Sequence, residues 1–215
     1  PRSRWCWAMA DTVSRSEVIA FRLRAHNLAQ RLGDEDLLDA AAPCGVQDSP
    51  PGSAVLALHA RVRDVTAQQV GAALDDDRSL LRTWSMRGAP FCFPTADAHV
   101  FTTGVLPPNE KAMRHLIAGV APAVDSLGMT VGAAVDLTAA EIGEVLSGRR
   151  LAIGDLGAEL AGRIAGTLPP GQRAAWEQEG PYAPGPPLGE AVVHFCLRIL
   201  TLRGVICFAA REGNQ

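Results

Sequence analysis

The stretch that most constrains the fold is LLRTWSMRGAPFCFP, residues 80–94. Two runs of strand-forming residues flank a turn that contains Gly88, and this pattern is typical of a β-hairpin. Apolar spacing predicts helices before it, at about 15–31, 34–42, 51–62 and 66–74. Helices followed by a β-hairpin are the element order of the winged-helix form of the helix-turn-helix, so the sequence predicts this fold.

Start and stop signals support the early helices. Ser14 to Glu17 and Thr66 to Gln69 have the spacing of a capping box. Gly33 is placed to end the first helix. That helix carries an apolar stripe, which we expect to pack into a core. The stripe consists of Val18, Phe21, Ala25, Leu28 and Leu32.

The second half of the sequence is predicted to be mainly helical. The expected helices are 95–104, 109–127, 130–147 (with a further capping box from Thr138 to Glu141), 155–166, 170–178 and 189–202, followed by a strand at 204–210. The predicted division is an extension or expression remnant at 1–8, a first winged-helix unit at 9–105, a helical second unit at 106–179, and an incomplete last winged-helix segment at 180–215. The fold class is therefore mainly α with small β-hairpins, in tandem winged-helix units.

Composition limits the possible functions. The net charge is −3 and the pI near 6.0, so any contact with phosphate has to come from a local patch of basic residues.

The five cysteines are scattered and odd in number, which favours free thiols in a reducing cytoplasm over a disulfide framework or a zinc site. No apolar stretch is long enough to cross a bilayer. The five histidines and the glycine pattern match no metal, nucleotide or hydrolase motif, so we expect no metal and no cofactor.

The hairpin contains candidates for contact with nucleic acid. Arg82 and Trp84 alternate along one strand and project from the same face, and Arg87 lies at the turn. Two arginines and an indole could hold phosphates and stack on a base. Arg22 and Arg24, on the polar side of the first helix, could join them. The alternative is a core tryptophan with arginines at its rim.

Gln47, Asp48 and Ser49 form a second candidate group. An Asp before Ser-Pro-Pro usually forms a turn by accepting backbone N–H groups. Gln47 comes between an apolar run and this turn, where a half-buried amide needs partners. Such an amide could also position a water molecule at a site.

Several segments resemble the AlkZ-like family, winged-helix DNA glycosylases that unhook interstrand crosslinks. They are GVQDSPPGSAVLALHAR (45–61), RSLLRTWSMRG (78–88), PYAPGPPLGEAVVHF (181–195) and LRGVICFA (202–209). The resemblance implies tandem winged helices followed by a β-barrel, with this chain ending before the barrel. It also implies double-stranded DNA as the partner. The scattered cysteines and the lack of a long apolar stretch predict a cytoplasmic location with no membrane partner.

The same resemblance implies a glycosylase site in which a Gln-x-Gln or Gln-x-Asp pair positions the water that attacks C1′ of the damaged nucleotide. Counting without gaps places the first Gln at Gln47 and the second at Ser49, whereas a shift of one place gives Gly45 and Gln47. Only one polar member is present in either register. Ala89-Pro90-Phe91 also replaces the family's Thr-Leu-His. The implied function is glycosylase-like, with Gln47, Asp48 and Ser49 as catalytic candidates. The alternatives are a non-catalytic, regulatory DNA-binding protein or a protein-interaction module.

Overall fold

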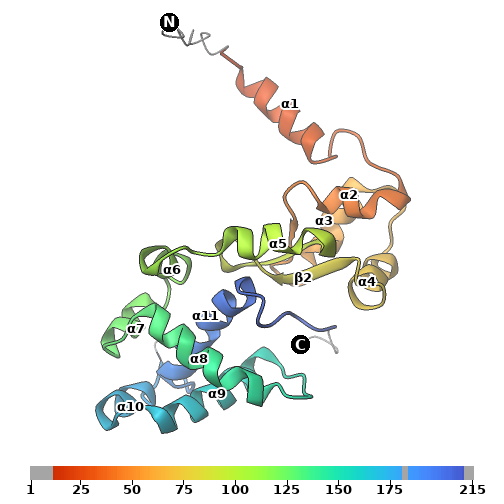
Figure 1. The fold of residues 1–215 in the computed structure, drawn as a ribbon. Helices are drawn as coiled ribbons and strands as arrows, with labels where there is room; N and C mark the ends of the chain where they lie inside the picture. The colour runs from red at the N-terminus through yellow and green to blue at the C-terminus, as the bar shows by residue number, and fades with distance from the viewer. Residues whose placement is uncertain (1–11, 181–183, 211–215) are drawn as a thin grey trace, which may run out of the picture.

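The computed structural model describes residues 12–180 and 184–210, which are mainly helical (Figure 1). The α-helices are α1 (Arg15–Ala25), α2 (Leu37–Ala41), α3 (Ser53–Arg61), α4 (Ala67–Asp75), α5 (Ala98–Phe101), α6 (Glu110–Leu116), α7 (Ala121–Ser126), α8 (Val131–Val145), α9 (Ile153–Thr167), α10 (Pro170–Trp176) and α11 (Leu188–Leu202). The strands are β1 (Val46–Gln47), β2 (Leu80–Trp84) and β3 (Pro90–Pro94). Short 3₁₀ turns are η1 (Asp34–Asp36), η2 (Met86–Gly88), η3 (Thr95–Asp97) and η4 (Thr103–Val105). The predicted extension at 1–8 lies outside the described residues.

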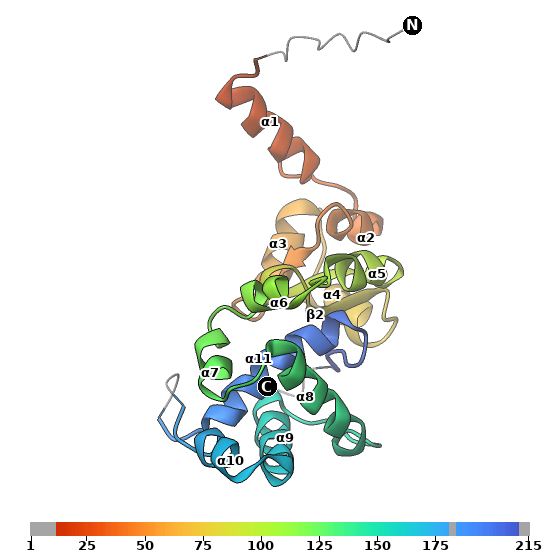
Figure 2. The same cartoon turned by 60° about the vertical axis from the view of Figure 1, so that its left-hand side comes forward.

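Helix α1 begins as predicted and packs differently from the prediction. The Ser14 capping box is present, because the Ser14 hydroxyl accepts from the Glu17 N–H and the Glu17 carboxylate accepts from the Ser14 N–H. The helix ends at Ala25, has no buried residue, and extends away from the other elements (Figures 1 and 2). The expectation that this helix packs its stripe into a core is therefore wrong; Leu32, which lies beyond the end of the helix, does pack against a core. At 100° per residue, Ile19 and Leu23 lie on a different side from Phe21, so the helix has no single apolar face to bury.

The next elements have the order of a winged helix. Helices α2, α3 and α4 surround an antiparallel sheet of order β1-β3-β2. The predicted hairpin is confirmed, with a register from Leu80 opposite Pro94 to Trp84 opposite Pro90. The 3₁₀ turn η2 connects its strands, and Arg87 and Gly88 there have positive φ angles of 59° and 64°. A core formed by buried aliphatic residues of α2, α3, α4, β1 and β2, together with Cys92 of β3, joins these elements.

Residues 106–202 build a second core. Helix α11 packs against α8 and α9, and its buried face confirms the predicted packing of that helix. The predicted helix 109–127 is divided into α6 and α7, because the chain turns between them to bury Ile117 and Val120 completely. Thr138 lies inside α8, where its hydroxyl donates to the Ala134 carbonyl, so the capping box expected at this position is wrong.

The strand predicted at 204–210 is not formed. These residues follow α11 without pairing to any strand in the part of the chain that the structure describes. Ile206 and Phe208 pack instead against the second core, which accounts for the apolar pattern that favoured a strand. Helix α11 shares its core with α8 and α9, so the residues on the two sides of the predicted boundary between 179 and 180 pack into one core. The predicted domain limits are not otherwise tested and stay predictions.

Trp84 connects the hairpin to the second core. It belongs to β2, yet its indole is 5% exposed and lies among the buried residues of the helical core. Its ring makes edge-on contacts with Phe208, at 4.8 Å between ring centroids, and with His194 of α11, at 5.9 Å. The alternative of a core tryptophan is therefore the one that the structure bears out.

Candidate functional site

Gln47 lies at the end of the short strand β1, opposite Phe91 of β3. Its side chain is half-buried, and its Oε1 accepts a hydrogen bond of 3.0 Å from an Nη of Arg87. Its backbone carbonyl accepts from the Ser53 hydroxyl at the start of α3. Gln47 is therefore held by its side chain to the turn of the hairpin (η2, here called the wing turn) and by its backbone to the start of α3.

Asp48 has a structural position. The residue is 3% exposed, and its Oδ1 accepts from the Gly52 N–H at 2.8 Å and the Ala54 N–H at 3.2 Å. Its Oδ2 is 3.9 Å from an Nη of Arg82. Oδ1 thus serves the turn before α3, as expected of a turn-forming Asp, and Oδ2 faces strand β2. Ser49, next in the chain, is exposed.

The structure separates the five predicted DNA-contacting residues. Arg87 is exposed at the wing turn, whereas the Arg82 side chain is only 11% exposed beside Asp48. Trp84 is buried and offers no face for stacking on a base. Arg22 and Arg24 are exposed on α1, which extends away from the hairpin (Figures 1 and 2). Of the predicted residues in the hairpin, Arg87 is therefore the one whose charged side chain is exposed at the turn.

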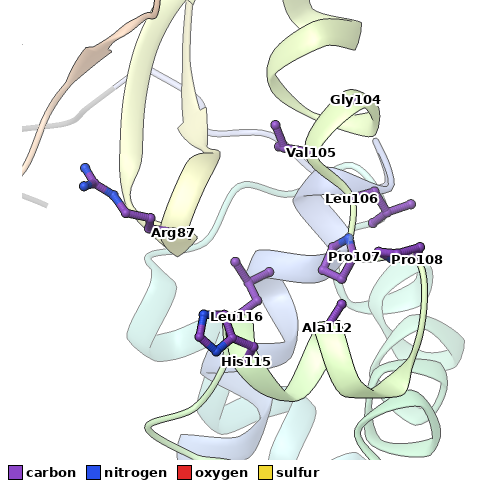
Figure 3. A pocket seen from close by; sticks show the side chains of 9 residues that line it. All are labelled: Arg87, Gly104, Val105, Leu106, Pro107, Pro108, Ala112, His115 and Leu116. Atoms are coloured by element: carbon purple, nitrogen blue, oxygen red, sulfur yellow. The ribbon is translucent and has the colours of Figure 1, made fainter.

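An open hollow of about 470 Å³ lies between the wing turn and α6 (Figure 3). Arg87 stands at one side of it and His115 of α6 at another, while Leu106, Pro107 and Leu116 add apolar walls. The Arg87 guanidinium points away from His115, in keeping with its bond to Gln47 (Figure 3). Sequence reasoning missed this site because α6 begins at Glu110, well after the end of the hairpin at Pro94, and its basic residues match no motif.

Arg198 of α11 packs against the turn of the hairpin at Gly88. A Cβ added at Gly88 would come within 3.1 Å of the Arg198 Cδ, so the absence of a side chain at Gly88 permits this close approach. The Arg198 guanidinium lies 4.2 Å from the centroid of the Phe195 ring. Burial lowers the pKa of Arg198, and burial together with the charge of Arg198 lowers the pKa of His194. The wing turn thus lies on a partly desolvated cationic residue.

Other classes of site are absent from the described residues. In residues 12–180 and 184–210, no three His, Cys, Asp or Glu side chains form a group that could hold a metal ion. Within the same ranges, no helix has the length and apolar character needed to cross a membrane.

Comparison with known proteins identifies the family. A family model described as "DNA glycosylase AlkZ-like" matches residues 40–215. This chain belongs to the AlkZ-like DNA glycosylase family. The match includes Gln47, the wing and all of the second core, and it confirms the resemblance found in the sequence.

A solved structure, the DNA glycosylase AlkZ of Streptomyces sahachiroi, is similar to this AlkZ-like chain with a TM-score of 0.59 and 21% sequence identity. The alignment covers 94% of this chain and 48% of that one, so the chain spans about half the length of this relative. At this identity the likeness is one of fold, and it agrees with the predicted class, mainly α with small hairpins. No curated protein matches.

Proposed function

We propose that this AlkZ-like chain binds double-stranded DNA and acts as a glycosylase-like protein on alkylated or crosslinked bases. The observation that carries the proposal is the placement of Gln47. Its half-buried amide lies between α3 and the wing, in a chain that belongs to a DNA glycosylase family, and an exposed arginine holds it.

The chemistry needs little from the protein when the base is alkylated at N7. Such a base carries a positive charge, so it leaves with the electron pair of the bond to C1′ and becomes neutral without being protonated. Water then attacks C1′ and releases its proton to solvent. The Gln47 carbonyl has two lone pairs; one accepts from Arg87, and the other can accept from this water. Placement of water and stabilisation of the sugar cation are effects of the kind that preorganised polar groups supply.

The rest of the Gln47-Asp48-Ser49 group supports weak catalysis at most. The carboxylate of Asp48 is buried in the turn, and Ser49 is exposed and short. Removing one positioned polar group from such a site typically costs about 10²–10³ in rate. These positions favour the second candidate function, a DNA-binding protein that recognises its target without excising the base.

An abasic-site assay on a duplex containing N7-alkylguanine tests the proposal. Wild type should release the base slowly, Gln47→Ala should abolish release, and Ser49→Gln should raise it by restoring a second amide. Gln68→Ala, a change of an exposed glutamine on α4, is the matched control and should leave the rate unchanged.

The outcomes separate the alternatives. If wild type and Ser49→Gln bind a crosslinked duplex and release no base, the catalytic part of the proposal fails and non-catalytic recognition replaces it. If neither variant binds duplex DNA at any salt concentration, the protein-interaction module becomes the better account.

A further inference from the structure

We propose that a groove along α6, from the wing turn to the start of α7, binds the sugar-phosphate backbone of one DNA strand. This inference rests on the proposed function and deepens it, because it gives the path by which a strand reaches Gln47.

The groove is formed by two adjoining hollows. The first, of about 470 Å³, runs from Arg87 along residues 104–108 to α6 (Figure 3). The second, of about 670 Å³, continues along α6 to Ala121 and Pro122. Both hollows are lined by Ala112 and His115, so they lie next to each other along this helix.

The basic character of the groove is local. Arg87, Lys111 and His115 line it, together with Arg114, whose charge is offset by Asp125 at 2.7 Å. No Asp or Glu is among the described residues that line either hollow. In a chain of net charge −3, a local surface that has basic side chains and no lining carboxylate favours an anionic partner.

Glu110 begins α6 and is the carboxylate that could weaken this effect. Its two oxygens instead accept from the Val131 N–H at 2.8 Å and the Gly132 N–H at 3.0 Å, at the N-terminus of α8. A carboxylate at a helix N-terminus is stabilised by the helix dipole and by these N–H groups. The negative charge is thus directed into a structural contact with α8.

The shape indicates an extended polyanion. Lys111 and His115 are four residues apart on one helix, so they are neighbours on one face at about 5–6 Å between Cβ atoms. Along a DNA strand, charges follow one another at about 3.4 Å of helix axis. Between Arg87 and His115 the walls are apolar, formed by Leu106, Pro107 and Leu116, which suits deoxyribose. Contacts of this kind bind DNA without reading its sequence.

Arg87 connects the groove to the candidate catalytic amide of Gln47, which itself lines neither hollow. Arg87 lines the first hollow and donates to Gln47, so a phosphate held at Arg87 would bring the neighbouring nucleotide to Gln47. The guanidinium has five N–H donors, so it can hold this phosphate and keep its bond to Gln47. A strand in the groove would therefore be delivered to an amide that stays in position.

Binding of a fluorescent duplex, followed by anisotropy at several salt concentrations, tests the groove. Lys111→Ala should weaken binding of all sequences equally, by about three- to ten-fold, and lower the magnitude of the log–log salt slope by about 1. Arg150→Ala removes an exposed cation from the segment between α8 and α9 and is the matched control. It should change affinity less than two-fold.

A second experiment uses the fact that Lys111 is the single lysine of the sequence. A duplex with an aldehyde on one strand should form an imine with the Lys111 amine, with loss of water, and cyanoborohydride should reduce this to a stable secondary amine. The crosslinked peptide, identified by mass spectrometry, should contain Lys111. Lys111→Arg should retain binding and lose this crosslink, which separates the position of the side chain from its charge.

Each result decides the matter. A weakened Lys111→Ala, an unaffected Arg150→Ala and a crosslink at Lys111 together support the groove. If the chain binds DNA and Lys111→Ala keeps the wild-type affinity and salt slope, the groove is wrong and the proposed function stands. If wild type binds no duplex, the proposed function and the groove fail together.

Discussion

Replacing Asp48 tests whether this residue stabilises the winged helix or belongs to the chemistry of the site. Its Oδ1 accepts from two backbone N–H groups at the start of α3, and its Oδ2 faces Arg82. Asp48→Ala removes all of these contacts. Asp48→Asn keeps an acceptor for the two N–H groups and removes only the charge beside Arg82.

The expected loss of stability follows from these contacts. Removing a side chain that accepts from the first N–H groups of a helix costs about 0.5–2 kcal/mol. Removing one member of a buried ion pair costs about 3–5 kcal/mol, and the 3.9 Å separation of Asp48 from Arg82 places this pair well below that range. We expect the free energy of unfolding to fall by about 2–4 kcal/mol in Asp48→Ala and by about half as much in Asp48→Asn.

Urea unfolding followed by far-UV circular dichroism measures this difference. With a typical urea dependence of about 2 kcal/mol per M, a loss of 3 kcal/mol lowers the midpoint by about 1.5 M. Asp77→Ala, in an exposed turn, is the control and should stay within about 0.5 kcal/mol of wild type. If Asp48→Ala unfolds at the wild-type midpoint yet loses base release, Asp48 acts in the chemistry and its structural assignment is refuted.

Three further predictions concern the rest of the chain. Gly189→Ala should lower the melting temperature strongly, because a Cβ there would meet the buried Trp176 ring at 2.1 Å, while Gly162→Ala, with open space around it in α9, should preserve or raise it. The lowered pKa of His194 means that this side chain binds a proton more weakly in the folded protein than in the unfolded chain. The free energy of unfolding should therefore fall as pH drops through the ordinary histidine range near 6.5. In thermal melts between pH 7.5 and 5.5, His194→Gln should make this decrease smaller. The amides of α1 should exchange with deuterium within seconds, because an eleven-residue helix without buried residues is only marginally stable in water, and slow exchange there would indicate a covering partner.

The sequence predicted best where local chemistry determines local structure. The capping boxes at Ser14 and Thr66 and the glycine turn of the hairpin each specify a helix start or a turn within a few residues, and all three are present. The α11 stripe was also predicted correctly, because a 15-residue apolar helix in a chain of this size has a core to enter.

The sequence-based predictions were wrong or incomplete where the local structure depends on contacts with residues distant in the sequence. The pattern in 204–210 has the composition of a strand, and only the position of Trp84 explains why its aromatic residue packs on a core instead. At the candidate site, the sequence indicated Gln47 and the wing, whereas the contact between Gln47 and Arg87 joins residues forty positions apart. The basic residues of α6 gave no local signal, since their significance depends on their position beside the wing.

Under the proposed function, the buried indole of Trp84 has a consequence for the way a duplex would be bound. A wing held only by its own sheet could flex and follow the curvature of the DNA. Here strand β2, the first strand of the hairpin, is anchored in the neighbouring helical core through Trp84, which should restrict movement between the hairpin and the helical unit. A duplex that touches both units has to adopt the angle between them, and its resistance to bending enters the free energy of binding. Sites weakened by a nick, a mismatch or a flexible pyrimidine–purine step bend more easily, and the protein should favour them over intact, stiff duplex even without contact to a single base edge.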